Sequence, residues 1–171
     1  MPPPVTIVGM GISPDDLTEK QRAVIAGAEI LVGGRRLLEP FDHLKCRRWV
    51  IDRNLAAVGD FVEAHICSHA IVVITSGDPL FFGIGAFLVR RLGADRVRIM
   101  PNVSAVAAAF ARLGESWQDV SVVSLHGRSH TGRLLRRLAD GDAVAVYTDP
   151  VHHPAWLAEL LIENNLSDVG M

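Results

Sequence analysis

The chain has 171 residues, of which 49% are hydrophobic and 21% are charged, and its formal net charge is −2 at pH 7. This composition is typical of a globular protein, and the negative charge argues against a general nucleic-acid-binding protein, which usually presents a strongly basic face. The two cysteines form no CxxC motif, and no apolar run approaches the roughly eighteen residues needed to cross a bilayer. We therefore expect a soluble, cytoplasmic protein with neither nucleic-acid nor membrane partners.

Residues 5–8 are predicted to form a short apolar strand, which runs into Gly9 and Gly11. A strand followed by GxG suggests a dinucleotide-binding fingerprint, but the third glycine would fall at Pro14. The segment from Ser13 to Asp16 instead resembles a capping box that opens a helix ending near residue 27. Its two first-turn carboxylates would occupy the positive end of the helix, where a pyrophosphate would have to sit.

The next elements continue the alternation of strands and helices. Residues 29–32 and 48–51 are predicted strands, and the first of them is followed by two glycines and then by Arg35 and Arg36. Asn54 is predicted to cap a helix. The inward-facing residues of this helix are predicted to be Leu55, Val58, Val62 and Ile66.

The most strand-like segment is 70–74, a continuous apolar run typical of a central strand buried on both faces. A strand-to-helix turn follows, in which Gly77 permits a sharp bend, Asp78 is predicted to cap the next helix and Pro79 to lie in its first turn. This helix is predicted to end at Gly93. In open parallel sheets, ligands collect at the carboxyl ends of the strands, so this turn is the best candidate for a binding edge.

A fifth strand is predicted at 97–100, and Ser104 is predicted to cap the alanine-rich helix 105–113. Strands alternating with helices predict a doubly wound α/β domain over residues 1–115. A second α/β domain is predicted over 119–171, with strands at 121–125 and 143–147. Because a further strand would be expected near the last residues, we expect this second domain to be incomplete.

Two other kinds of chemistry are disfavoured. His126, His130, His152 and His153 lie in two loops without a matching acid cluster, so we expect no metal site. The chain has no GxSxG motif and no serine or cysteine paired with a histidine by motif, which argues against a nucleophilic enzyme.

Taken together, the motifs resemble those of the tetrapyrrole (corrin and porphyrin) methylases. The matching segments are residues 8–11, 15–18, 76–81 and 101–105. The resemblance is greatest to the members that methylate carbon 5 of precorrin-7 or cobalt-precorrin-7 in cobalamin biosynthesis, because of three further segments, 124–128, 147–149 and 32–36. The resemblance implies a tetrapyrrole methylase fold of two α/β domains, with S-adenosylmethionine in the cleft between them.

The resemblance also implies a set of site residues. Those expected to line the cofactor are Gly9, Gly11, Ile12, Ser76, Gly77, Asp78, Phe81, Ser104, Ala105, Tyr147 and Thr148. Asp78 is expected to orient the cofactor and His126 to accept a proton released from the macrocycle. Arg35, Arg36, Arg53 and Arg128 are expected to meet the substrate carboxylates. Methyl transfer of this kind needs alignment more than a strong acid or base.

Several alternatives stay open. The motifs mark the cofactor site rather than the ring position, so another tetrapyrrole position is possible. An NADP-dependent Rossmann reductase would use Gly9, Gly11 and Arg35, and a non-catalytic tetrapyrrole-binding domain would need no methyl donor. The resemblance implies a homodimer, with a decarboxylating C15 methylase as a functional partner.

Overall fold

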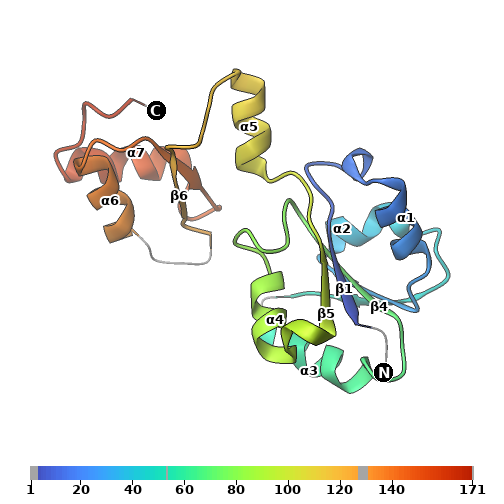
Figure 1. Ribbon diagram of the computed structural model, residues 1–171. Helices are drawn as coiled ribbons and strands as arrows, with labels where there is room; N and C mark the ends of the chain where they lie inside the picture. Colours follow the sequence, from blue (N-terminus) through green and yellow to red (C-terminus); the bar gives the residue numbers. More distant parts are fainter. Residues whose placement is uncertain (1–3, 53, 127–130, 171) are drawn as a thin grey trace. The chain divides into compact units, whose positions relative to one another are not determined.

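The computed structural model describes residues 4–170 except Arg53 and residues 127–130. The chain divides into two compact units, Met1–Ala109 and Phe110–Met171 (Figure 1). The boundary falls within helix α5 (Ala105–Leu113), so the start of this helix belongs to unit 1.

Unit 1 is built around a five-stranded sheet with the strand order β3-β2-β4-β1-β5, in which every neighbouring pair is parallel. The strands are β1 (Val5–Gly9), β2 (Ile30–Gly33), β3 (Arg47–Val50), β4 (Ile71–Thr75) and β5 (Val97–Met100). Every residue of β1 and β4 is buried, as predicted for central strands. Because parallel strands end at the same edge, the loops after β4, β1 and β5 are neighbours.

Helices cover both faces of this sheet (Figure 1). The helices and short 3-10 turns of unit 1 before α5 are η1 (Pro14–Asp16), α1 (Glu19–Ala26), α2 (Arg35–Leu38), η2 (Glu39–Phe41), α3 (Leu55–His65), α4 (Gly85–Leu92) and η3 (Ala94–Arg96). Successive strand residues point to opposite faces, so Val73 packs with Val62 of α3 and Leu88 of α4, whereas Ile74 lies in the core cluster with Ile25 of α1.

Four details of the predicted helices are wrong. Ser13 forms its capping box on the single turn η1, and the chain is extended at Leu17 before Thr18 caps α1 separately. Asp78 caps no helix, because its Oδ1 accepts a hydrogen bond from the nearby Leu80 N–H at 2.8 Å. The backbone of Phe82 is left-handed (φ 58°), and α4 begins only at Gly85, so Pro79 does not lie in its first turn as predicted. Leu55, predicted to face inward, is 44% exposed.

Unit 2 contains the parallel pair β6 (Ser121–Ser124) and β7 (Val144–Tyr147), together with α6 (Thr131–Ala139) and α7 (Pro154–Glu163). Its core is a separate small cluster of buried side chains: Val123, Leu125, Leu134, Leu157 and Leu161. No helix among the described residues is both long and apolar enough to cross a membrane.

Candidate functional site

The loops that follow β1 and β4 are joined by backbone hydrogen bonds. The N–H of Met10 donates to the carbonyl of Thr75 at 2.8 Å, and the N–H of Gly77 donates to the carbonyl of Gly11 at 2.9 Å. Gly11 and Gly77 thereby form an isolated antiparallel bridge just beyond the ends of the two parallel strands. Two segments more than sixty residues apart in the sequence are therefore held as one surface.

Glycine is required where these loops meet. A Cβ atom on Gly9 would lie 2.3 Å from the carbonyl oxygen of Gly77 and 3.1 Å from the backbone nitrogen of Asn102. Gly11 and Gly77 have φ angles of 75° and 58°, in the left-handed region that favours glycine. The glycines predicted to turn the chain beside a ligand thus also let the backbones of separate loops touch.

The loop after β5 completes the same edge. The side-chain amide of Asn102 donates to the carbonyls of Gly9 at 3.0 Å and Asp16 at 3.1 Å. A Cβ atom on Gly77 would lie 3.6 Å from the Cα of Ser104, which places the loop after β4 against the start of α5. Ser104 caps this helix as predicted, since its Oγ accepts a hydrogen bond from the N–H of Ala107 at 3.1 Å.

The first loop uses its own carboxylate where a phosphate would otherwise bind. Oδ2 of Asp16 accepts hydrogen bonds from the N–H groups of Ile12 at 2.8 Å and Ser13 at 3.1 Å. A pyrophosphate bound in the Rossmann manner would need these donors and would meet the negative charge of Asp16. This arrangement argues against a dinucleotide at the end of β1.

The loop of residues 76–84 presents apolar side chains around Asp78. The rings of Phe81 and Phe82 meet edge to face with their centroids 4.9 Å apart. Leu80 and Phe82 are 51% and 39% exposed, and Ile12 on the neighbouring loop is 46% exposed. Exposed apolar side chains of this size, grouped at a strand-end edge, are typical of a surface that contacts a partly apolar ligand.

The remaining predicted site residues have different positions. Arg35 and Arg36 are exposed in the first turn of α2, directly after β2, and so lie at the carboxyl edge of the unit 1 sheet. Tyr147 is the last residue of β7 and Thr148 follows it, and His126 lies two residues beyond the end of β6, so these residues are at the corresponding edge of unit 2. Arg53 and Arg128 lie outside the described residues.

Two residues that hold the site together were not predicted to belong to it. One is Asn102, which lies in the matching segment 101–105 but is not among the predicted site residues. The other is Gln21, which is 3% exposed and donates through Nε2 to the carbonyl of Pro101 at 3.0 Å. The signal for Gln21 is its position three residues after Thr18, where a glutamine closes a capping box. Its second contact, across the sheet edge, carries no sequence signal.

The sheet and its three joined loops define a doubly wound α/β protein, a class in which ligands bind at the carboxyl ends of the strands. The chain belongs to the tetrapyrrole (corrin/porphyrin) methylases, whose family model matches residues 4–170. This finding confirms the predicted family and fold class.

Particular relatives are consistent with this assignment. The chain is 35% identical over 159 residues to a cobalt-precorrin-7 C(5)-methyltransferase of Salmonella typhimurium, covering 92% of this chain and 77% of that protein. It is 34% identical over 170 residues to a precorrin-6Y C(5,15)-methyltransferase [decarboxylating] of Sinorhizobium sp, covering 95% of this chain and 39% of that longer protein. Among solved structures, a precorrin-6Y methylase of Archaeoglobus fulgidus superposes with a TM-score of 0.67 at 26% identity, covering 85% of this chain and 73% of that one.

Proposed function

We propose that this chain transfers a methyl group from S-adenosylmethionine to carbon 5 of precorrin-7 or cobalt-precorrin-7. The joined loops at the carboxyl edge of the sheet are the observation that carries this proposal, because they bring together three of the segments expected to hold the cofactor. The names of the Salmonella and Sinorhizobium relatives support the ring position. Methylation at another position of a tetrapyrrole is the second candidate.

The residues at this edge fit an S-adenosyl cofactor better than a dinucleotide. Gly77 and the start of α5 form a close-packed surface without bulky side chains, and Ile12 and Leu80 add apolar area beside it. The carboxylate of Asp16 disfavours a phosphate but not a ligand that carries a positive charge. When bound, S-adenosylmethionine supplies an electrophilic methyl group on a sulfonium.

In this proposal, the protein acts by positioning. The Oδ1 atom of Asp78 accepts a hydrogen bond from the N–H of Leu80, and we propose that its carboxylate accepts a further hydrogen bond from a hydroxyl or ammonium group of the cofactor. In this proposal the cofactor is surrounded by further residues of the same loop and of the start of α5, namely Ser76, Gly77, Phe81, Ser104 and Ala105. Alignment of two reactants supplies up to about 7–11 kcal/mol of barrier reduction, so the site needs no nucleophile of its own.

We further propose roles for the basic residues. The exposed guanidinium groups of Arg35 and Arg36 bind substrate carboxylates as charge-assisted pairs. Their position after β2 puts them on the same sheet edge as the proposed cofactor site. His126 accepts the proton that leaves the macrocycle after methylation, while Tyr147 and Thr148 contribute to cofactor binding.

Cofactor binding and methyl transfer test the proposal separately. S-adenosylhomocysteine at about 100 times its Kd should stabilise the protein by about 2.7 kcal/mol, whereas NADPH should leave its melting temperature unchanged. Mass spectrometry of the product from precorrin-7 or its cobalt form should show one added methyl group, and NMR of the product should place it at carbon 5. A melting temperature raised by NADPH alone would favour the reductase, and binding of a tetrapyrrole without methyl transfer would favour the non-catalytic domain.

A matched pair of variants tests the role of Asp78. Asp78→Asn should weaken S-adenosylhomocysteine binding and lower turnover, because it replaces a charged acceptor by a neutral amide. Asp140→Asn, at an exposed position after α6, should change neither. Unchanged affinity and turnover in Asp78→Asn would show that the role assigned to Asp78 is wrong.

The role of His126 is tested by the pH dependence of the rate. His126→Ala should alter the pH–rate profile, and an unaltered profile would show that His126 does not accept the proton.

The predicted assembly is also part of the proposal. We propose a homodimer, and a decarboxylating C15 methylase as functional partner. Analytical ultracentrifugation of the purified chain should give twice the monomer mass, and a monomer mass at micromolar concentration would contradict the dimer. Co-purification with the C15 methylase from a strain that produces both proteins tests the partner.

A further inference from the structure

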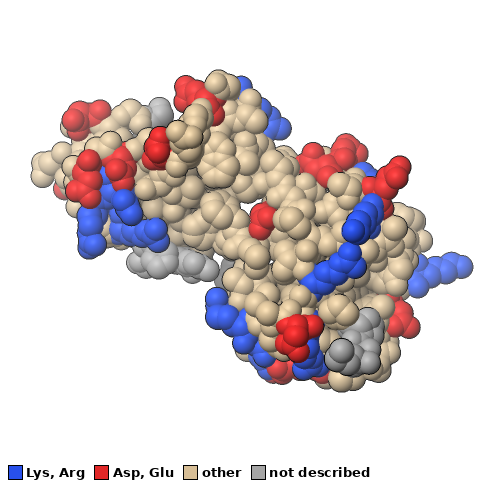
Figure 2. All heavy atoms as spheres, viewed as in Figure 1, with Lys and Arg blue, Asp and Glu red and all other residues tan. Residues whose placement is uncertain are grey.

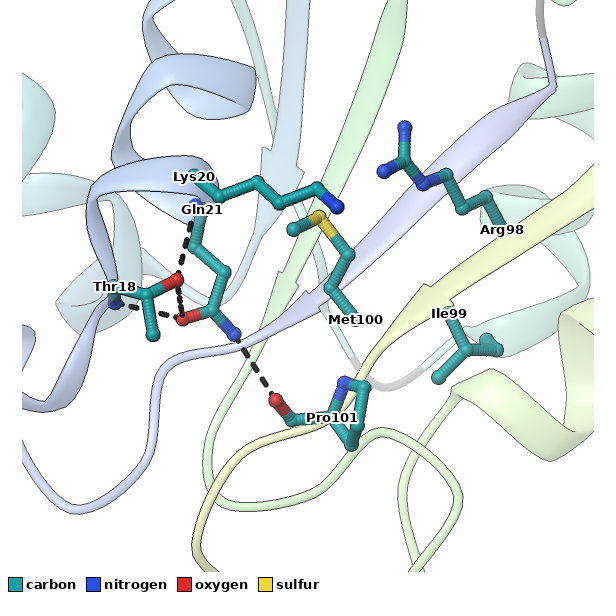
Figure 3. A pocket seen from close by; sticks show the side chains of 7 residues that line it. All are labelled: Thr18, Lys20, Gln21, Arg98, Ile99, Met100 and Pro101. Carbon is teal, nitrogen blue, oxygen red and sulfur yellow. Dashed lines mark hydrogen bonds between the residues drawn. The ribbon is translucent and has the colours of Figure 1, made fainter.

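A pocket of about 270 Å³ lies between the beginning of α1 and the edge strand β5, and neither glycine of the Gly11–Gly77 bridge lines it (Figure 3). Its lining residues are Thr18, Lys20, Gln21, Arg98, Ile99, Met100 and Pro101. No role was assigned to Lys20 or Arg98 in the methylation site. The volume lies at the small end for ligand sites, so the pocket can take a small molecule rather than a whole macrocycle.

Two positively charged side chains flank this pocket. Arg98 and Met100 share one face of β5 because strand residues two apart point to the same side, and this is the face that α1 covers. Lys20 extends from α1 across the same face, and its ammonium end and the guanidinium of Arg98 lie on one side of the pocket (Figure 3). Basic side chains lie next to each other over the strip between α1 and β5 (Figure 2).

Neither cation forms an ion pair within the described part of the chain. Lys20 and Arg98 are both exposed and take part in none of the ion pairs found there, which involve Arg48, Arg91, Arg137 and His152. Two like charges at one pocket repel each other, and an anion bound between them would remove this repulsion. The pocket therefore favours a ligand with a negative charge at this end.

The remaining lining residues of the pocket indicate the chemistry of the rest of the ligand. The polar groups of Thr18 and Gln21 are already paired, since Oε1 of Gln21 accepts from the N–H and the hydroxyl of Thr18 and Nε2 donates to Pro101. The first-turn N–H groups that often bind phosphate are thus partly used by capping. Ile99, Met100 and Pro101 provide an apolar wall. This combination fits a carboxylate on an apolar body.

We propose that this pocket binds a small aliphatic carboxylate, whose carboxylate group pairs with Lys20 and Arg98 and whose hydrocarbon part lies on Met100 and Pro101. The inference is independent of the methylation proposal, because none of these residues belongs to the proposed cofactor set. The pocket is also next to the proposed cofactor site. Gln21, which lines the pocket, donates through Nε2 to the carbonyl of Pro101 and, at 3.5 Å, to the carbonyl of Gly9.

The probe for the test is hexanoate, added to the full chain while backbone amide shifts are followed by NMR. Saturable shifts are expected at Thr18, Gln21 and Met100. Lys20→Gln and Arg98→Gln should each weaken binding by about tenfold, as expected for loss of one charge-assisted contact. Lys45→Gln and Arg90→Gln are matched controls at exposed positions in other parts of unit 1, and they should leave the affinity unchanged.

Further probes separate the two halves of the proposed ligand. Hexanol lacks the charge and inorganic phosphate lacks the apolar body, so each should shift the same amides much less than hexanoate. Raising the salt concentration should weaken hexanoate binding, because the cations are exposed. No saturable shift with millimolar hexanoate, equal shifts with hexanol or phosphate, or equal weakening in the control variants would each overturn the proposal. A dimer interface that covers β5 and abolishes binding would also overturn it.

Discussion

Replacement of Gly9 by alanine tests whether the three joined loops act as one unit. The added Cβ would lie 2.3 Å from the carbonyl oxygen of Gly77, 2.9 Å from Cδ of Pro79 and 3.1 Å from the backbone nitrogen of Asn102. Real Cβ contacts are essentially never shorter than 3.0 Å. Two of these three atoms belong to the backbone, so the clash cannot be relieved by a side-chain rotation, and the loops after β4 and β5 must both move.

The expected loss of stability follows from this geometry. Overpacking a close-packed site costs about 1–3 kcal/mol, and we expect Gly9→Ala to reach about 2–3 kcal/mol because the backbone resists displacement. For a chain of this size, this corresponds to a melting temperature lower by roughly 5–10 °C. Thermal unfolding followed by circular dichroism measures it. Isothermal titration should show S-adenosylhomocysteine binding weakened at least about tenfold, because the displaced loops line the proposed site.

Gly27→Ala is the matched control. Its added Cβ would come no closer than 3.5 Å to any neighbour, which is an ordinary contact, and its φ of −85° suits alanine. This variant should stay within about 0.5 kcal/mol of the parent protein and bind the ligand normally. If Gly9→Ala were as stable as Gly27→Ala, the close approach of the loops would be refuted. A destabilised Gly9→Ala with normal affinity would instead separate the loops from ligand binding.

Three further outcomes follow from single contacts. Asn102→Ala should destabilise the protein by about 1–3 kcal/mol in urea unfolding, because it removes the shorter of the two amide contacts to the carbonyl of Gly9 and the hydrogen bond to the carbonyl of Asp16, and unchanged stability would show that water replaces them. Thr75→Val should raise the melting temperature slightly, since the buried Thr75 hydroxyl has no hydrogen-bond partner among the described residues, and a clear loss of stability would contradict this. Hydrogen bonding to Arg91 lowers the pKa of Glu63, so its contribution to stability is present above the pKa of an unfolded glutamate and is lost as the pH falls through the lower folded value. Arg91→Gln should therefore reduce stability at pH 7 and make less difference toward pH 3, and an equal loss at both pH values would exclude this linkage.

The patterns that could be read from sequence were those with a local physical cause. The continuous apolar run that became β4 predicted a central strand, because a strand buried on both faces presents apolar side chains to both of them. Ser104 and Asn54 were correctly predicted as helix caps, since a cap depends on a side chain and the next few residues. The cap at Asp78 was wrong for a related reason. A local turn to Leu80 competes for the same carboxylate, and short-range sequence cannot decide between the two.

The sequence alone determined the strand-and-helix alternation, the parallel sheet and the family, because apolar periodicity, capping residues and ordered motifs are all local signals. Only the tertiary structure decided which distant atoms meet. Three features depend on the strand order β4-β1-β5: the Gly11–Gly77 bridge, the hydrogen bond from Asn102 to the carbonyl of Gly9, and the pocket lined by both Lys20 and Arg98. Strand order brings residues about ninety positions apart within hydrogen-bonding distance. Such contacts arise from packing of the whole sheet, which no short stretch of sequence encodes.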